Sequence, residues 1–366
     1  MPSNAMGVLK VIQYTLTILP IVVIAIVDNL LFPLKHIKNK GNSQYHRMRS
    51  IIMDSPTMKY LAENNYIMSL KRKVINSNHA RLSSGSIVKL IYLKGRNLWG
   101  LVRFALEVST NLANYLKIYK MKNSHKNQKA IVVGNGPSQG LLSLDTMLRF
   151  KSNGGRVIVV NFWTENKLLS KCIPDYLVIS DPATLTNKDP DLEYKNKNLW
   201  AYLLRHKEIL LIAPLNRVCE LKGIIGHDRV IGFCDSEIRM WSKNTAPVYP
   251  RGYLSMTLYK ALAMAKWMGF SRIYVIGMDN TYPRNLYCDN LNRILNLEVH
   301  AGGEDYISDL SARYHSIAEI LEDLVDLFYD AKKFSDETVV NLDPFSLTDA
   351  FNKVDSIGNI GVELNN

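Results

Sequence analysis

The sequence predicts an α/β protein whose body is a doubly wound, mostly parallel, Rossmann-like sheet. Short aliphatic and β-branched runs recur at regular intervals after residue 130, and helical stretches, clearest at 253–268 and 313–333, separate several of them. Fully apolar runs of this length are typical of strands that are buried on both faces. The strands expected on this basis are residues 131–133, 157–160, 176–180, 209–213, 230–233, 273–277 and 338–342.

The stretch AIVVGNGPSQG at residues 130–140 marks the end of the first expected strand. Its glycines, asparagine, proline and serine end the strand, and LLSLDTMLRF after them has helical spacing. Strand, tight loop and helix in this order bring backbone N–H groups to a place where α/β proteins bind phosphates. The dinucleotide fingerprint does not fit, because Gln139 stands where Gly or Ala is needed, and the Gly-Lys-Ser/Thr of a P-loop is missing. We therefore expect an anion-binding turn of another class.

Charge divides the chain into two unequal parts. Residues 1–130 carry 20 Lys and Arg against four Asp and Glu, a surplus of +16, whereas the remainder carries 25 against 29. From this change we predict a membrane anchor with a basic flank (1–50), a basic amphipathic helical region (51–129), a catalytic domain (130–350) and a C-terminal tail (351–366).

The run VIQYTLTILPIVVIAIVDNLLFPL at residues 11–34 is 24 residues long, which is enough to cross a bilayer. Gln13, Pro20 and Asp28 weaken a simple span, so a re-entrant or monotopic anchor and a buried core helix are the alternatives. Only Lys10 precedes the run closely, and five Lys and Arg follow it between 35 and 49. This excess is on the wrong side for a cleaved signal peptide. The positive-inside rule then predicts that the body lies on the cytoplasmic face of the inner membrane.

In residues 71–129, lysines and arginines alternate with apolar residues and Trp99 at near-helical spacing. This pattern is typical of amphipathic helices on anionic membranes, and an ordinary helix with a solvated basic face is the alternative. Nucleic acid is not expected as a partner, since no nucleic-acid motif accompanies the pattern. The four cysteines, at 172, 219, 234 and 288, lack metal-ligand spacing, which favours a reducing compartment and no structural metal.

Polar residues directly after strands are the best candidates for a site, because ligands of open α/β sheets bind beyond the carboxyl ends of the strands. Asn135, Asn161, Asp181 and Asp279 all stand in such positions. Each one alone is equally consistent with a loop residue or a helix cap. Four of them in one predicted sheet favour a ligand site.

Three motifs resemble the bacterial metal-independent sialyltransferases of glycosyltransferase family 42: GNGPS at 134–138, VVNFW at 159–163 and MGFSRIYVIGMDNTY at 268–282. PDYLVISDP at 174–182 is also similar to MptE-like and motility-associated-factor glycosyltransferases. The likeness covers roughly residues 130–350. It implies a GT-A-like variant of the Rossmann fold and inverting transfer of a sugar, most simply sialic acid, from a CMP-activated donor to lipopolysaccharide, capsule or another surface glycan.

The resemblance also implies which residues contact the donor. Asn135 and Asn161 match donor-contacting asparagines, and Asp181 matches a third such position, where the sialyltransferases have Asn. An Asp accepts hydrogen bonds from ribose hydroxyls but repels a sugar carboxylate, so this departure leaves the sugar open. The expected donor-binding residues are Gly134, Asn135, Gly136, Ser138, Asn161, Asp181, Ser255, Thr257 and Asp279.

In that family, two tyrosine hydroxyls stabilise the phosphate leaving group without a metal, and Tyr282 and Tyr287 stand at nearly the same spacing. A phenol suits this role because its hydrogen bond strengthens as charge builds up on the phosphate. A Tyr282 that only packs in a loop is the alternative. Arg251 is the candidate for holding a carboxylate or phosphate, and Ser255 and Thr257 are equivalent candidates beside it. No metal and no cofactor other than the CMP-sugar co-substrate are expected.

Two histidines are candidates for the general base that activates an acceptor hydroxyl. His315 precedes a long amphipathic helix, as the base of the sialyltransferases does, and is preferred. His300 instead resembles a histidine of related polysaccharide proteins. The glycine-bearing acidic stretch AGGEDYISD between them is expected to form a lid that excludes water.

The sequence therefore predicts a membrane-associated glycosyltransferase with a nucleotide-sugar donor, a glycan or glycolipid acceptor and membrane lipids as partners. The family likeness also implies a homo-oligomer. Two alternatives stay open: an MptE-like, Mg²⁺-dependent pterin pyrophosphokinase, and a membrane-tethered nucleotide-binding module without turnover.

Overall fold

The computed structural model describes residues 86–181, 193–226, 228–238, 244–298, 306–311 and 316–365. The chain forms two compact units, Met1–Val102 and Arg103–Asn366, so the division falls earlier than the predicted boundary at 129–130. The predicted anchor at residues 11–34 lies outside the described residues. Within the described ranges, no helix combines the length and the apolar character that crossing a bilayer requires.

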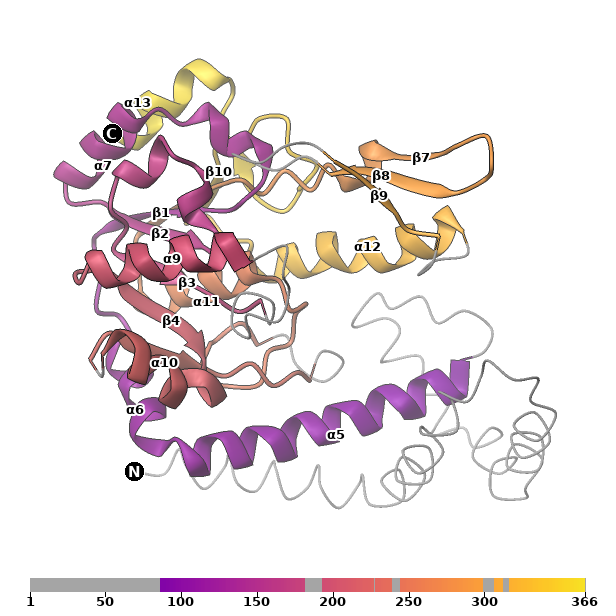
Figure 1. The fold of residues 1–366 in the computed structure, drawn as a ribbon, viewed down its shortest axis with the longest axis horizontal. Helices are drawn as coiled ribbons and strands as arrows, with labels where there is room; N and C mark the ends of the chain where they lie inside the picture. Colours follow the sequence, from indigo (N-terminus) through magenta and orange to yellow (C-terminus); the bar gives the residue numbers. More distant parts are fainter. Residues whose placement is uncertain are drawn as a thin grey trace. The chain divides into compact units, whose positions relative to one another are not determined.

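The second unit contains the predicted α/β sheet (Figure 1). Its described part has eight strands in the order β11-β10-β6-β1-β2-β3-β4-β5, and every neighbouring pair is parallel. All seven strands expected from the sequence are present, which confirms the fold class. The strands are β1 (Lys129–Val133), β2 (Arg156–Val160), β3 (Tyr176–Val178), β4 (Leu210–Pro214), β5 (Val230–Phe233), β6 (Arg272–Ile276), β10 (Val339–Asn341) and β11 (Asn352–Lys353).

The central strands are buried because helices cover both faces of the sheet. Each of β1, β2 and β6 is buried over its last four residues, as expected for fully apolar strands of a parallel sheet. Helix α11 packs along β1, β2 and β3, and ten of its twelve residues are buried. Gly269, with a φ of +80°, ends α11 in the left-handed conformation that favours glycine.

The helices alternate with the strands as the sequence predicts. The stretches expected at 253–268 and 313–333 correspond to α11 and α12, although both helices begin about four residues later than expected. The helices are α5 (Ser86–Thr110), α6 (Leu112–Lys120), α7 (Leu144–Ser152), α9 (Glu193–Arg205), α10 (Val218–Ile225), α11 (Thr257–Met268), α12 (Ile317–Ala331) and α13 (Ile360–Asn365).

The turn after β1 differs from the expected strand–loop–helix unit. A 3₁₀ turn, η1 (Pro137–Leu141), follows the glycines, and α7 begins only at Leu144. The reason is local, because the Ser143 side chain accepts a hydrogen bond from Thr146 N at 3.0 Å and so caps the helix there. As a result, it is the 3₁₀ turn and not the start of α7 that follows the glycine-rich loop directly.

A small antiparallel sheet was not expected from the sequence. It consists of β7 (Leu286–Cys288), β8 (Ile294–Glu298) and β9 (Tyr306–Asp309), in that order. Asp289 stabilises the β7–β8 turn, since its Oδ1 accepts hydrogen bonds from Leu291 N and Arg293 N at 2.9 Å each. Figure 1 shows the three strands extending from the body next to α12. The predicted lid overlaps β9, and its glycines lie outside the described residues.

Both ends of the second unit reach beyond the predicted catalytic domain. On the N-terminal side, Ile118 of α6 is fully buried and its carbonyl accepts a hydrogen bond from Trp267 Nε1 at 2.8 Å. On the C-terminal side, β11 joins the sheet and α13 packs on α7 with Ile360 and Leu364 buried. The stretch expected as a tail after residue 350 is therefore part of the folded unit.

Candidate functional site

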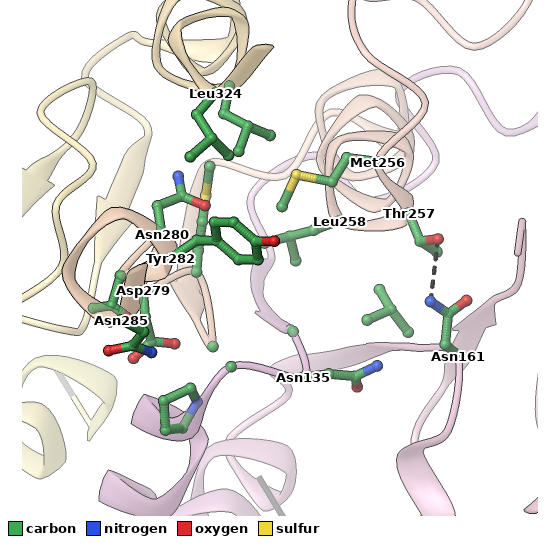
Figure 2. Close-up of a pocket in the computed structure, with 18 of the residues that line it drawn as sticks. Asn135, Asn161, Met256, Thr257, Leu258, Asp279, Asn280, Tyr282, Asn285 and Leu324 are labelled. Carbon is green, nitrogen blue, oxygen red and sulfur yellow. Dashed lines mark hydrogen bonds between the residues drawn. The ribbon is translucent and has the colours of Figure 1, made fainter. Parts of the chain in front are cut away.

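A cavity of about 440 Å³ lies beyond the carboxyl ends of β1 and β6 (Figure 2). These strands are neighbours, but the chain completes β2 to β5 on one side before it returns to form β6, β10 and β11 on the other. This is the topological switch point at which open α/β sheets bind ligands. Eight of the predicted site residues line the cavity, namely Gly134, Asn135, Gly136, Asn161, Ser255, Thr257, Asp279 and Tyr282.

The glycines of the GNGPS loop allow two backbone segments to approach closely. Gly134 N donates to Ile276 O at 2.8 Å, and Gly136 N donates to Gly277 O at 3.1 Å. A Cβ added to Gly134 would lie 2.4 Å from Gly277 O, and Gly277 itself has a φ of +73°. Side chains at these positions would therefore push the end of β1 away from the end of β6.

Ser138 and Asp279 extend the same connection. Ser138 N donates to Asp279 Oδ1 at 2.8 Å, and Ser138 Oγ accepts from Gly277 N at 2.9 Å. Ser138 is buried and does not line the cavity, so its hydroxyl holds the two loops together and does not face a ligand. The N–H groups of both loop glycines and of Ser138 are thus used within the protein, and Pro137 has none. The expectation that these backbone N–H groups cradle a phosphate is not met for these three positions.

Asp279 is the one carboxyl among the described residues that line the cavity. Burial, reinforced by the nearby Asp343, raises its pKa from 3.8 to about 6, although the hydrogen bond from Ser138 N opposes the shift. Its Oδ2 atom is buried and has no hydrogen-bond partner among the described residues. A cavity carboxyl with a pKa near 6 changes protonation close to neutral pH, which makes it a candidate for direct ligand contact.

Asn161 closes β2 on the other side of the cavity. Its φ of +44° lies in the left-handed region that Asn tolerates better than most residues. Its Nδ2 donates to Thr257 Oγ1 at 3.2 Å, and Thr257 Oγ1 lies 2.7 Å from Ser180 Oγ (Figure 2). The Oδ1 atom of Asn161 is buried without a partner in the described structure. This network fixes the amide of Asn161 in the wall of the cavity, which Asn135 also lines.

Helix α11 begins at the cavity. Ser255, Met256 and Thr257 line it, and no side chain caps the helix N-terminus in the described structure. The buried Lys260 Nζ donates to Ser255 Oγ at 2.9 Å and lies 2.7 Å from Asp235 Oδ1. Burial lowers the pKa of Lys260, and the ion pair with Asp235 opposes that shift. An uncapped helix N-terminus next to a cavity favours the binding of an anion there.

Arg251 does not line the cavity, contrary to the expectation for a phosphate- or carboxylate-binding residue. Its guanidinium is buried, with Nε 3.1 Å from Asp235 Oδ1 and Nη2 2.9 Å from Glu237 Oε2. Nη1 also donates to Tyr253 O at 2.6 Å. Two carboxylates and a carbonyl therefore hold Arg251 in the protein interior, where it supports the segment before α11.

The two predicted tyrosines occupy different environments. Tyr282 lines the cavity from the 3₁₀ turn η6 (Tyr282–Asn285), and Figure 2 shows its ring projecting into the cavity. Asn285 Nδ2 donates to Leu297 O at 3.0 Å, which connects this turn to β8. Tyr287 is 40% exposed on β7 and does not line the cavity. Of the pair, the structure thus brings only Tyr282 to the candidate site.

The remaining predicted residues are not placed in the cavity. Asp181 is half-buried, follows β3, and does not line it. His300 and His315 both lie outside the described residues, so the choice between them as general base stays a prediction.

Sequence reasoning missed several polar residues that line the cavity. Asn280 directly follows Asp279, and its Nδ2 donates to Thr348 Oγ1 at 2.7 Å. Asn285 and Asn296 belong to η6 and to β8 of the small sheet. For Asn296, the sequence signal that could have indicated a role was an asparagine within the short apolar stretch ILNLE at 294–298, because Asn is uncommon in strands.

Within the described residues, no group of three or more His, Cys, Asp and Glu side chains is arranged to hold a metal ion. Metal independence of the reaction stays a prediction. Cys172 and Cys234 are buried and Cys219 and Cys288 exposed, all as free thiols.

Known proteins show only a distant similarity to this chain. No protein-family model matches the chain, and neither does any curated protein. Among solved structures, the chain is similar to the MAf glycosyltransferase from Magnetospirillum magneticum AMB-1, with 14% identity and a TM-score of 0.39. The match covers 68% of this chain and 40% of that protein. Similarity this distant transfers no activity, and the resemblance to family-42 sialyltransferases stays a hypothesis from the motifs.

Proposed function

We propose that the chain is an inverting, metal-independent glycosyltransferase that transfers sialic acid or a related sugar from a CMP-activated donor to a lipopolysaccharide, capsule or other surface glycan. The observation that carries the proposal is the cavity at the switch point. Residues that were expected, from separate motifs, to bind the donor line this one cavity, although the third motif lies more than a hundred residues after the first two in the sequence.

The cavity offers distinct partners for the parts of a nucleotide sugar. Carboxamides such as those of Asn135 and Asn161 both donate and accept hydrogen bonds, which suits a base or a ribose. The uncapped N-terminus of α11, with Ser255 and Thr257, is the better place for the phosphate, because the N–H groups of Gly134, Gly136 and Ser138 are already used.

In the proposed reaction, the oxygen of an acceptor hydroxyl forms a bond to the anomeric carbon as the bond from that carbon to the phosphate oxygen breaks. The electron pair leaves with the phosphate, and the hydroxyl proton passes to a base, for which His315 and His300 are the candidates. Tyr282 donates a hydrogen bond to the leaving phosphate and stabilises its growing charge. Attack on the face opposite the leaving group inverts the anomeric centre.

We also propose that this enzyme works at the cytoplasmic face of the inner membrane. In the second unit, Leu106, Leu112 and Leu116 are each more than half exposed, and Lys117 and Lys120 stand next to them in the sequence. Exposed large apolar side chains combined with lysines are typical of helices that lie on anionic lipid. Co-sedimentation of the full chain with anionic but not with neutral vesicles is the expected result, and equal absence of binding to both would contradict it.

The enzymatic proposal is tested by release of CMP from CMP-sugars, starting with CMP-N-acetylneuraminate and CMP-Kdo, with glycolipid acceptors and the full chain in detergent. Transfer is expected to continue in EDTA. Tyr282→Phe should lower turnover by about 10²–10³-fold, the range for loss of one donor to a transition-state charge. Tyr194→Phe, at an exposed position on α9, is the matched control and should leave turnover unchanged.

The alternatives predict other outcomes. Activity that requires Mg²⁺ and a pterin substrate would support the pyrophosphokinase. Binding of CMP without transfer by the intact protein, unaffected by loss of both His300 and His315, would support a non-catalytic module. Stabilisation by UDP- or GDP-sugars alone would exclude the CMP-sugar donor.

A further inference from the structure

One wall of the cavity is built outside the parallel sheet. Asn296 and Leu297 of β8, with Leu324 and Leu327 of α12, line the cavity together with the residues after the strand ends. Asn296 is 1% exposed. Neither its Oδ1 nor its Nδ2 has a hydrogen-bond partner among the described residues.

An unpaired buried carboxamide destabilises a folded protein, because both of its polar groups lose their hydrogen bonds to water without replacement. Two further orphaned atoms, Asn161 Oδ1 and Asp279 Oδ2, belong to residues that line the same cavity from the segments after β2 and β6. Orphaned polar atoms from three separate elements around one cavity indicate that their partners come from a ligand.

The residues around Asn296 indicate which kind of ligand group would bind there. A carboxamide presents a donor and an acceptor side by side, which matches two hydroxyl groups of a sugar ring. The three leucines named above offer apolar contact to the C–H face of such a ring. The wall that Asn296 and the three leucines form contains no charged side chain, so this part of the cavity favours a neutral group.

We propose that Asn296 is a sugar-specificity residue, whose carboxamide donates to one hydroxyl and accepts from a second hydroxyl of a sugar bound between β8 and the ends of β1 and β6. This inference rests on the proposed function, because it takes the ligand to be a sugar. The sugar belongs either to the nucleotide donor or to the acceptor, and binding and kinetics distinguish these sources.

The experiment compares the wild-type full chain with Asn296→Leu and Asn296→Ser by isothermal titration with CMP and with CMP-N-acetylneuraminate or CMP-Kdo. Since the Asn296 side chain has no described partner to lose, Asn296→Leu is expected to keep or raise the thermal midpoint. Asn114→Leu is the matched control: Asn114 Oδ1 accepts a hydrogen bond from Lys222 Nζ, so this variant should melt lower and bind ligands unchanged.

If Asn296 binds the donor sugar, both Asn296 variants should bind CMP within about twofold of wild type but lose tenfold or more of the extra affinity that the sugar provides. If it binds the acceptor sugar, the affinity for the CMP-sugar should be unchanged, and the KM for the acceptor should rise tenfold or more. Donor hydrolysis without acceptor would then stay at the wild-type rate.

The inference is overturned if both variants match wild type in donor affinity and in acceptor KM. It is also overturned if Asn296→Leu melts as far below wild type as Asn114→Leu does, because Asn296 would then have a structural partner. A wild-type chain that binds neither CMP-sugar more tightly than CMP would instead defeat the proposed function itself, and the inference with it.

Discussion

The buried carboxyl of Asp279 leads to a specific prediction about how the stability of the folded protein depends on pH. Its pKa is raised from 3.8 to about 6, so the folded protein holds this proton more tightly than the unfolded chain does. The folded state is therefore favoured at low pH, and stability decreases as the pH rises from about 4 to about 6. Above that range, the raised pKa amounts to about 3 kcal/mol of lost stability.

Asp279→Asn removes this buried charge and keeps an oxygen that can accept the hydrogen bond from Ser138 N. The new amide N–H groups lack a partner, which costs about 1 kcal/mol. A net gain of about 2 kcal/mol at pH 7.5, and little or no gain at pH 4, is expected from these terms. The assay is urea unfolding of the full chain in detergent, followed by tryptophan fluorescence at both pH values. A gain of the same size at both pH values, or a loss at pH 7.5, would refute the argument.

Three further substitutions, with Gly140→Ala as a control, test contacts within the second unit, two at the cavity and one away from it. Gly134→Ala should lower stability by about 2–3 kcal/mol by overpacking against Gly277 O, whereas Gly140→Ala, with open space around it, should be nearly neutral in the same urea assay. Thr257→Val should cost about 1–3 kcal/mol and weaken CMP binding by calorimetry, because Asn161 and Ser180 lose their shared partner. Tyr115→Phe should cost about 1 kcal/mol in urea unfolding without changing the CMP affinity, since its hydroxyl donates to Val248 O at 2.8 Å far along the chain. Unchanged stability in Gly134→Ala, Thr257→Val or Tyr115→Phe would show that the corresponding contact is not made in solution.

Seven of the eight described strands of the parallel sheet could be predicted from the sequence, because each is a compact apolar run with its own local signal, whereas the two residues of β11, Asn352 and Lys353, have none. The position of the cavity could be predicted for the same reason, since polar residues follow β1, β2 and β6 directly. The small sheet could not, because its strands β7, β8 and β9 have only three, five and four residues, which is too short for a clear local signal.

The roles of individual residues depended on contacts that are distant in the sequence. The glycines of GNGPS predict a phosphate-binding loop, but their N–H groups donate to the end of β6, about 140 residues away in the sequence. Arg251 was predicted to bind a ligand anion. In the structure its guanidinium instead pairs with Asp235 and Glu237, which only the fold brings close to it. In both cases the residue type correctly indicated that the group forms strong hydrogen bonds. The partner could not be predicted, because it is brought close only by the fold.

The central claim is that the cavity between the ends of β1 and β6 binds a nucleotide through protein groups alone, without a divalent metal ion. A crystal structure of the full chain grown with CMP and EDTA tests it most directly. We predict the nucleotide in that cavity, in contact with Asn135, Asn161 and the first turn of α11. A nucleotide bound at any other place, or one that enters the cavity only with a divalent ion, would contradict the account.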